Sequence, residues 1–361
     1  MEQKETVAQY RALPTKIIEP SNNISTPDKI KLGKLLFYDP ILSGNKDVAC
    51  ATCHHPDYGY AEPLDLSIGV NGIGIGRNRR FKIPNNIPHT KRNAHTILNT
   101  AYNGINSNGT YNAETSPMFW DNRAVSLEGQ ALLPILSLEE MRGTTIKEDH
   151  ALDTIVNRLT KIKEYKNLFS LAFPENKKID STNILKAIAS FERTLTTPNS
   201  RFDKFIAGDN NALSEVEKQG FKLFKKAKCH QCHSGPMFSD FKIHALGVID
   251  NEKLGFSDDG FNKTYGFRTP SLRNLRHTAP YMHNGKLTSL KKVLEFYEDI
   301  SNGKSQNPNI SQLDSLVSQI NLKGKDMSPI LSFFNSLNSE DYDKSIPKKV
   351  PSELPVGGNI Y

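Results

Sequence analysis

Apolar residues of this chain recur mostly three or four positions apart, the spacing of one helix face, and strand-like alternation is sparse. A first helix is predicted to begin at Thr26, a capping residue followed by proline, and to end near residues 39–40. A second is predicted over residues 183–195, whose apolar side chains share one face. A third begins at Ser214, which forms a capping-box pattern with Glu217. The sequence therefore predicts a mostly α-helical protein with few or no strands.

Two segments are predicted to be loops because Gly, Pro, Asn and Ser dominate them, residues 69–90 and 103–116. The glycines at 72–76 do not form a nucleotide-binding loop, since no helix start follows them. Residues from 347 onward again contain Pro and Gly, and we expect them to wrap the surface.

The four cysteines occur in two copies of the pattern C-x-x-C-H, the attachment signature of c-type haem. The copies comprise Cys50, Cys53 and His54, and Cys229, Cys232 and His233. In each copy the thiols can add across the haem vinyl groups, and the histidine can ligate iron. A zinc site or a redox dithiol would also use C-x-x-C. Because His follows both copies directly and no cysteine is left over, the sequence favours two covalently bound c-type haems.

A second repeated pattern, G-x-x-L-F, occurs at residues 33–37 and 220–224, just before each haem motif. This repeat indicates two related cytochrome c-like helical domains, each with one haem. Turn-rich sequence near 205–212 marks the predicted boundary between them. The predicted division is an N-terminal arm or tether, two haem domains and a tail, at residues 1–25, 26–207, 208–345 and 346–361.

Length and composition are those of an ordinary soluble protein, with 361 residues, of which 37% are hydrophobic and 24% charged. No apolar run approaches the roughly 18 residues of a membrane span. The net charge of +7 is modest and the cations are scattered, which argues against nucleic-acid binding. The first residues lack the apolar stretch of a signal peptide. Because such haems are attached outside the bacterial cytoplasm, we expect a periplasmic protein, free or tethered to a membrane, whose export signal is missing from this sequence.

Three stretches resemble the bacterial dihaem cytochrome c peroxidase and MauG family: the first haem motif, residues 119–123 and residues 278–285. Their order and spacing also match, so the resemblance extends from about residue 28 to residue 300. It implies a periplasmic protein of two mostly helical domains. It further implies that the N-terminal haem reacts with hydrogen peroxide, that the C-terminal haem handles electrons, and that a calcium ion lies between the domains.

The first iron is expected to have an open coordination position. Peroxidase members of the family cap this iron at rest with a second histidine, and sixteen residues beyond His54, at the matching place, this sequence has Val70. Valine cannot ligate iron, whereas an iron that reacts with peroxide needs a vacant position. Other nearby histidines offer alternative ligands: His55, His89 and His95.

The resemblance also assigns a peroxide pocket by distance from Trp120, the one tryptophan of the sequence. Glu140, twenty residues further on, matches the family's distal carboxylate, which can move a proton between the peroxide oxygens. Gln130 matches a hydrogen-bonding position and Pro134 a residue that crowds the distal face. Trp120 itself matches an indole between the haems that can carry an electron. Taken alone, Glu140 would be an ordinary acid on a solvated helix and Trp120 a core residue.

The second iron is expected to be fully ligated, by His233 and Tyr297. Tyr297 falls fourteen residues after His283, where peroxidase members have methionine. The apolar spacing of residues 287–297 allows one helix face to hold the phenol at the haem, although plain core packing would show the same spacing. The competing ligands are Met282, Met237 and Met327. A phenolate ligand favours the higher oxidation state of iron, which resembles the MauG side of the family.

Asn93, Thr278 and Pro280 match the family's calcium site, the last two through main-chain carbonyls. Oxygen donors of this kind suit calcium. Loop and turn residues without a metal role would look the same.

The sequence and the resemblance together predict a dihaem oxidoreductase that reduces hydrogen peroxide at the first haem. The second haem and Trp120 would supply or hold the second oxidising equivalent, with a small cytochrome or copper protein as electron donor and a homodimer as an option. MauG-like oxidation of an organic or protein substrate is the alternative that Val70 and Tyr297 favour. A rival from another class is an electron carrier or haem sensor without catalysis, which would need six ligands at the first iron.

Overall fold

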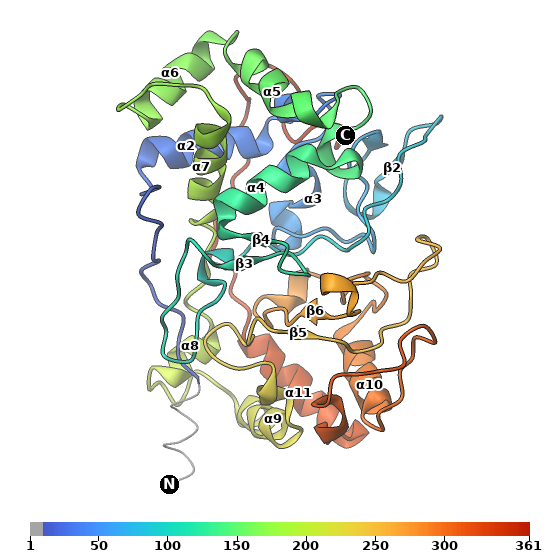
Figure 1. The fold of residues 1–361 in the computed structure, drawn as a ribbon. Helices are drawn as coiled ribbons and strands as arrows, with labels where there is room; N and C mark the ends of the chain where they lie inside the picture. Colours follow the sequence, from blue (N-terminus) through green and yellow to red (C-terminus); the bar gives the residue numbers. More distant parts are fainter. Residues whose placement is uncertain (1–9) are drawn as a thin grey trace. The chain divides into compact units, whose positions relative to one another are not determined.

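Ten helices form most of the regular structure in residues 10–361, the part of the chain that the computed structural model describes (Figure 1). They are α2 (Pro27–Tyr38), α3 (Cys50–Cys53), α4 (Ser126–Leu136), α5 (Ala151–Leu159), α6 (Lys163–Ala172), α7 (Ser181–Glu192), α8 (Arg201–Ile206), α9 (Glu215–Lys226), α10 (Leu290–Ile300) and α11 (Gly324–Ser336). None of these described helices is long and apolar enough to cross a membrane.

Strands are short and few, as expected. Each has two residues: β1 (Gly72–Ile73), β2 (Arg80–Phe81), β3 (Pro117–Met118), β4 (Ala124–Val125), β5 (Ile243–His244) and β6 (Phe267–Arg268). β1 pairs with β2 in antiparallel fashion, and β5 pairs with β6 in the same way. The predicted class, mostly α with few strands, is therefore confirmed.

The residues cluster into two units, each built from separated stretches of the chain. The first-haem unit contains the Cys50 motif and comprises Glu19–Ala101, Val125–Thr196 and Asp343–Tyr361. The second-haem unit contains the Cys229 motif and comprises residues 10–18, Tyr102–Ala124 and Thr197–Tyr342. One boundary near residue 207 does not describe this arrangement, because Tyr102–Ala124 packs with later residues and Asp343–Tyr361 with earlier ones.

In the first-haem unit, α2 and α7 cross at Gly33. A Cβ atom at Gly33 would lie 1.8 Å from the carbonyl oxygen of Ala187 and 3.0 Å from the Cβ of Phe191, so only glycine permits this approach. α2 begins where predicted, because the Thr26 hydroxyl accepts a hydrogen bond from the Lys29 amide (3.2 Å).

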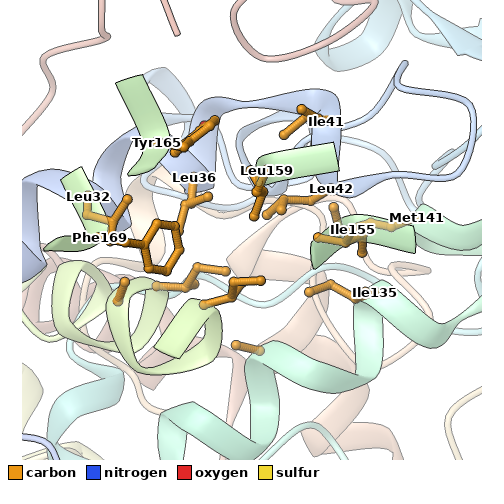
Figure 2. Close-up of a cluster of buried hydrophobic side chains, with 14 of the residues drawn as sticks. Leu32, Leu36, Ile41, Leu42, Ile135, Met141, Ile155, Leu159, Tyr165 and Phe169 are labelled. Carbon is orange, nitrogen blue, oxygen red and sulfur yellow. The ribbon is translucent and has the colours of Figure 1, made fainter. Parts of the chain in front are cut away.

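The core of the first-haem unit is built from one apolar face of each of several helices (Figure 2). Leu36 of α2, Ile135 of α4, Ile155 of α5 and Phe169 of α6 are each 2% exposed or less. Isolated helices shorter than about 12–15 residues are marginal in water. The shared core therefore stabilises these helices more than their own propensities do.

In the second-haem unit, α9 and α11 repeat the same crossing. A Cβ atom at Gly220 would lie 1.9 Å from the carbonyl oxygen of Pro329 and 2.9 Å from the Cβ of Phe333. The predicted capping box is present at the start of α9: the Ser214 hydroxyl accepts from the Glu217 amide (3.4 Å), and the Glu217 carboxylate accepts from the Ser214 amide (2.9 Å). Each copy of G-x-x-L-F thus marks a close helix crossing.

Segments outside the helices also pack into the units. The predicted arm, residues 1–25, falls within the described residues only from residue 10 onward. Tyr10 is fully buried, and its hydroxyl donates to the main-chain oxygen of His233 (3.0 Å), so this part is packed and is not a loose tether. In the first-haem unit, the carbonyl oxygen of Gly357 accepts from the Thr52 hydroxyl (2.7 Å). The tail therefore packs directly against the first haem motif.

Candidate functional site

The first haem motif lies on the short helix α3, with Cys50 and Cys53 partly buried and free of disulfide bonds. Thr52 anchors this helix to the tail through its bond to Gly357. His54 Nδ1 lies 3.0 Å from the carbonyl oxygen of Tyr60. Since this contact orients the ring through Nδ1, Nε2 is the nitrogen that would ligate a haem iron. Burial lowers the pKa of His54, which favours the neutral imidazole that metals bind.

Val70 is fully buried and tied to the segment that carries Glu140. The Val70 amide donates to the carbonyl oxygen of Glu140 (3.1 Å). A Cβ atom at Gly69 would lie 2.2 Å from the same oxygen, so the two backbones are in direct contact. Arg79, also buried, donates from Nη2 to the Gly69 carbonyl (2.7 Å) and from Nε to the Ile68 carbonyl (2.5 Å). These bonds fix residues 68–70, and the side chain that this loop presents at position 70 is aliphatic.

The histidines considered as alternative ligands have local surroundings of their own. His55 Nδ1 accepts a hydrogen bond from the Asp57 amide (3.3 Å). The His89 ring packs on Phe81, with ring centroids 5.0 Å apart. His95 is partly buried. The His55 and His89 rings are therefore held by neighbouring residues.

α4 and the turn after it present the predicted pocket residues. Gln130 and Pro134 are four residues apart on α4 and so share a face. Among the described residues, nothing bonds the buried oxygen Oε1 of Gln130, as expected where a bound molecule completes the site. Glu140 lies in the π-helical turn Leu138–Arg142, where its amide donates to the Ser137 hydroxyl (3.3 Å). Burial and, to a smaller extent, the Glu140 charge raise the pKa of both attachment cysteines, so this carboxylate lies near α3.

Two buried carboxyl groups near the first motif were not predicted. Glu62 is 2% exposed, and burial raises its pKa to about 7. Glu192 of α7 is 4% exposed, and burial raises its pKa to about 8. The Glu62 charge acts on Cys53 and the Glu192 charge on Cys50. The burial of Glu192 could have been predicted, because this acid continues the apolar face of its helix. Glu62 lies in a loop without such a pattern.

The second haem motif is held like the first. Its cysteines follow α9, with Cys229–Gln231 in a 3-10 turn. His233 Nδ1 lies 2.9 Å from the carbonyl oxygen of Phe238, and burial lowers the pKa of His233. The ring is thus oriented for iron ligation through Nε2.

A cavity borders this second motif. Its empty space, counted out to and including the open mouth, is about 1070 Å³. The cavity is lined by both attachment cysteines, His233, Tyr297 and Met282. The other two candidate methionines, Met237 and Met327, belong to apolar core clusters. Tyr297 projects from α10, and burial raises the pKa of its phenol. The structure therefore leaves Tyr297 and Met282 as candidates for the second axial ligand, and the lining fits a haem attached to this motif.

Trp120 lies in the wall of the same cavity. The indole is 9% exposed and meets the His283 ring edge-on, with centroids 6.5 Å apart. His283 in turn stacks on Phe267 at 3.7 Å. The Trp120 carbonyl oxygen accepts from the Arg268 amide (2.6 Å). The indole is therefore fixed at the edge of the space that the second haem would fill.

The residues expected to bind calcium come from both units. Asn93, in the first-haem unit, is buried, and its amide group donates to the Leu64 carbonyl (2.8 Å). Thr278 and Pro280 belong to the second-haem unit. The Thr278 hydroxyl donates to the Leu275 carbonyl (3.4 Å), so a metal role would fall to its main-chain oxygen. The calcium site stays a prediction.

Comparison with known proteins gives one consistent family. The family model for di-haem cytochrome c peroxidase matches residues 27–211. The chain is 33% identical to the methylamine utilization protein MauG of Methylorubrum extorquens over 94% of this chain and 86% of that protein. It is 30% identical to the cytochrome c551 peroxidase of Nitrosomonas europaea over 94% and 87%. A solved MauG-like protein associated with microbial copper homeostasis superposes with a TM-score of 0.72 at 28% identity, covering 91% of this chain and 95% of that one.

Proposed function

Because the chain belongs to the di-haem cytochrome c peroxidase family, whose members are oxidoreductases that act on peroxide, we propose that it reduces hydrogen peroxide at a haem held by Cys50, Cys53 and His54. The observation that carries this proposal is the loop fixed by Arg79, which sets Val70 against the backbone of Glu140. An aliphatic residue in that place supplies no ligand, so the iron keeps a position for peroxide.

When bound, the haem supplies an iron at which peroxide binds and its O–O bond is cleaved. Glu140 takes the proton from the oxygen nearer the iron and gives it to the leaving oxygen. Gln130 orients peroxide by accepting a hydrogen bond at Oε1, the atom that nothing in the described chain satisfies. Pro134 shares that helix face and has no donor, so it fills space without competing for the oxygens. Two electrons and two protons complete the reduction to two waters.

The second haem, held by Cys229, Cys232 and His233, is proposed to take Tyr297 as its other ligand. Tyr297 stands on a regular helix that lines the cavity, and phenolate is the harder donor of the two candidates for oxidised iron. Trp120, fixed in the same wall, is the proposed carrier of an electron or a hole between the haems. A small cytochrome or a copper protein in the periplasm would donate electrons, and calcium at Asn93, Thr278 and Pro280 would support the fold.

A second candidate function is MauG-like oxidation of an organic or protein substrate. Tyr297 favours it, because a haem stabilised in its oxidised state is a poor acceptor from a high-potential cytochrome. Steady-state peroxide consumption with reduced cytochrome as donor separates the two. Rapid turnover supports the peroxidase, and a haem spectrum that peroxide changes reversibly, without cytochrome oxidation, supports the MauG-like reaction.

The test of the proposal is Glu140→Gln, with the adjacent Glu139→Gln as matched control. Loss of the acid–base group should slow the reaction with peroxide by roughly 10²–10⁴-fold in stopped-flow measurements. The haem absorption spectrum should stay unchanged in both variants, and Glu139→Gln should react at the wild-type rate. Wild-type rates in Glu140→Gln would remove this residue from the mechanism and overturn the assignment of the pocket.

A further inference from the structure

His244 stands between two carboxylates at the cavity of the second haem motif. Its Nδ1 lies 2.7 Å from Oδ2 of Asp314, and its Nε2 lies 3.1 Å from Oδ2 of Asp240. All three side chains are largely removed from water, with exposed fractions of 9% for His244, 12% for Asp240 and 23% for Asp314. No motif predicted this cluster, in which His244 and Asp314 are 70 residues apart in sequence.

The backbone holds both carboxylates in place. Oδ1 of Asp240 accepts from the Lys242 amide (3.0 Å), and Oδ1 of Asp314 accepts from the Leu316 amide (2.8 Å). The Asp240 amide also donates to the carbonyl oxygen of Cys232 (2.8 Å). Each carboxylate therefore has one oxygen bound to the main chain and the other aimed at the imidazole. Bonds of this kind favour the ionised form of an acid.

The ring between them is an imidazolium. A ring nitrogen that faces a carboxylate oxygen donates its proton, and here both nitrogens do so. Burial lowers the pKa of His244, but the hydrogen bonds to Asp240 and Asp314, together with the neighbouring Cys232 thiol, raise it well above its usual range. One cation and two anions leave the group with a net charge of −1.

This charge is not cancelled by the rest of the cavity wall. The other charged residues of the lining are two cations and two anions: Lys228, Arg268, Asp250 and Asp258. Asp240 and His244 also lie at the attachment point of the haem, because their ligand atoms and that of Cys232 are all within 4.8 Å of one another. A buried charge so close to a redox centre acts through a low dielectric.

We propose that Asp240, His244 and Asp314 form an anionic clamp that lowers the reduction potential of the second haem and favours its oxidised state. The inference rests on the proposed function in one respect, that a haem is attached at Cys229 and Cys232. It makes residues that do not ligate the iron determinants of the reduction potential, in addition to the proposed ligand Tyr297. The alternative use of the cluster, a metal site with Cys232, would require both the thiol that carries the haem and a ring nitrogen that already carries a proton.

The experiment compares Asp314→Asn and Asp240→Asn with wild-type holoprotein by spectroelectrochemical titration at pH 6. Asparagine keeps the shape and removes the negative charge, and its single oxygen can accept one of the two hydrogen bonds that the carboxylate accepts. A unit charge about 10–15 Å from the iron changes the ratio of reduced to oxidised haem at a fixed applied potential by roughly five- to fifteenfold. A tenfold change equals about 59 mV for this one-electron couple. Both variants should raise the reduction potential of the second haem by the amount that corresponds to this five- to fifteenfold change.

Asp209→Asn is the matched control, since Asp209 is exposed in the same unit and does not line the cavity. It should leave the potential unchanged. Using two separate aspartates guards against a variant that fails to fold. Potentials that stay at the wild-type value in either folded variant, with unchanged low-spin spectra, would overturn the clamp. So would stoichiometric zinc in the purified holoprotein. A protein with only one haem per chain would instead refute the proposed function, which separates the two failures.

Discussion

The two haem-attachment units use one scaffold in different surroundings. In each, the glycine of G-x-x-L-F touches the main chain of a facing helix, and the motif histidine is held by a carbonyl oxygen, at 3.0 Å in the first unit and 2.9 Å in the second. Aligned by these contacts, Phe191 corresponds to Phe333, so Glu192 corresponds to Phe334. One unit therefore has a buried carboxyl beside Cys50 where the other has an aromatic ring. The scaffold is shared by both units, and at this position of the facing helix only the first unit has a group that can hold a proton.

The surroundings also differ in what they offer the iron. In the first-haem unit, a rigid loop presents Val70, an aliphatic side chain. In the second-haem unit, the cavity wall presents a phenol, Tyr297, and a fixed anionic group around His244. With the ligation proposed above, a first iron beside acids and without a second ligand would suit chemistry on a small molecule, whereas a ligated second iron in a charged wall would suit storage of electrons or holes.

Val70→His should erase the difference in ligation and have the largest effect. A histidine that binds the iron about 2.7 kcal/mol more favourably than the vacant state would reduce the reactive fraction, and hence the peroxide rate, about 100-fold. Electron paramagnetic resonance of the ferric protein should lose its high-spin signal, while stopped-flow mixing reports the rate.

Val70→Leu is the control for this change, because leucine is apolar and cannot ligate iron. It should keep the high-spin signal and a peroxide rate near that of the wild type. A wild-type protein that already shows two low-spin haems would contradict the open site and support the electron-carrier alternative.

Gly33→Ala and Gly220→Ala test whether the shared scaffold is equally tight in both units. Each new Cβ would meet a backbone carbonyl oxygen at under 2 Å, so the helices must move apart. We expect each substitution to lower the free energy of unfolding by roughly 1–3 kcal/mol, as overpacking does. Urea unfolding followed by circular dichroism measures the loss.

Gly129→Ala serves as the reference, since its Cβ on α4 would meet only the Ser126 hydroxyl oxygen at 3.7 Å. There the better helix propensity of alanine should stabilise by about 0.5–1 kcal/mol. If Gly33→Ala behaved like Gly129→Ala, the two crossings would not be equivalent and the comparison would fail.

Glu192→Gln addresses the smallest difference, one carboxyl group. The pKa of Glu192 is about 8 in the folded chain and about 4.3 in an unfolded one, so folding favours the protonated form. Its contribution to stability is complete below pH 4 and is lost as the pH rises toward 8, by at most about 1.4 kcal/mol per pH unit. Glutamine should flatten this pH dependence.

The measurement is the free energy of unfolding between pH 5 and pH 8, with exposed Glu164→Gln as the control from the same unit. The control should retain the wild-type slope. A Glu192→Gln protein with an unchanged slope would mean that this carboxyl is ionised when folded, and the units would then differ less than their sequences indicate.

Features that depend on neighbouring residues could be predicted from the sequence, and those that depend on distant ones could not. Caps at Thr26 and Ser214 follow from local hydrogen bonds, and the haem motifs follow from fixed spacing. By contrast, the packing of Tyr102–Ala124 with later residues is a matter of long-range burial. The pair formed by His244 and Asp314 likewise joins two segments that no periodicity relates.

The tail of the first-haem unit has a consequence for how the protein is made. Thr52, between the two cysteines of the first motif, bonds to a carbonyl 305 residues downstream, at Gly357. During synthesis, the second motif emerges before this partner does. The first motif therefore gains this contact only after almost the whole chain, the second motif included, has been made.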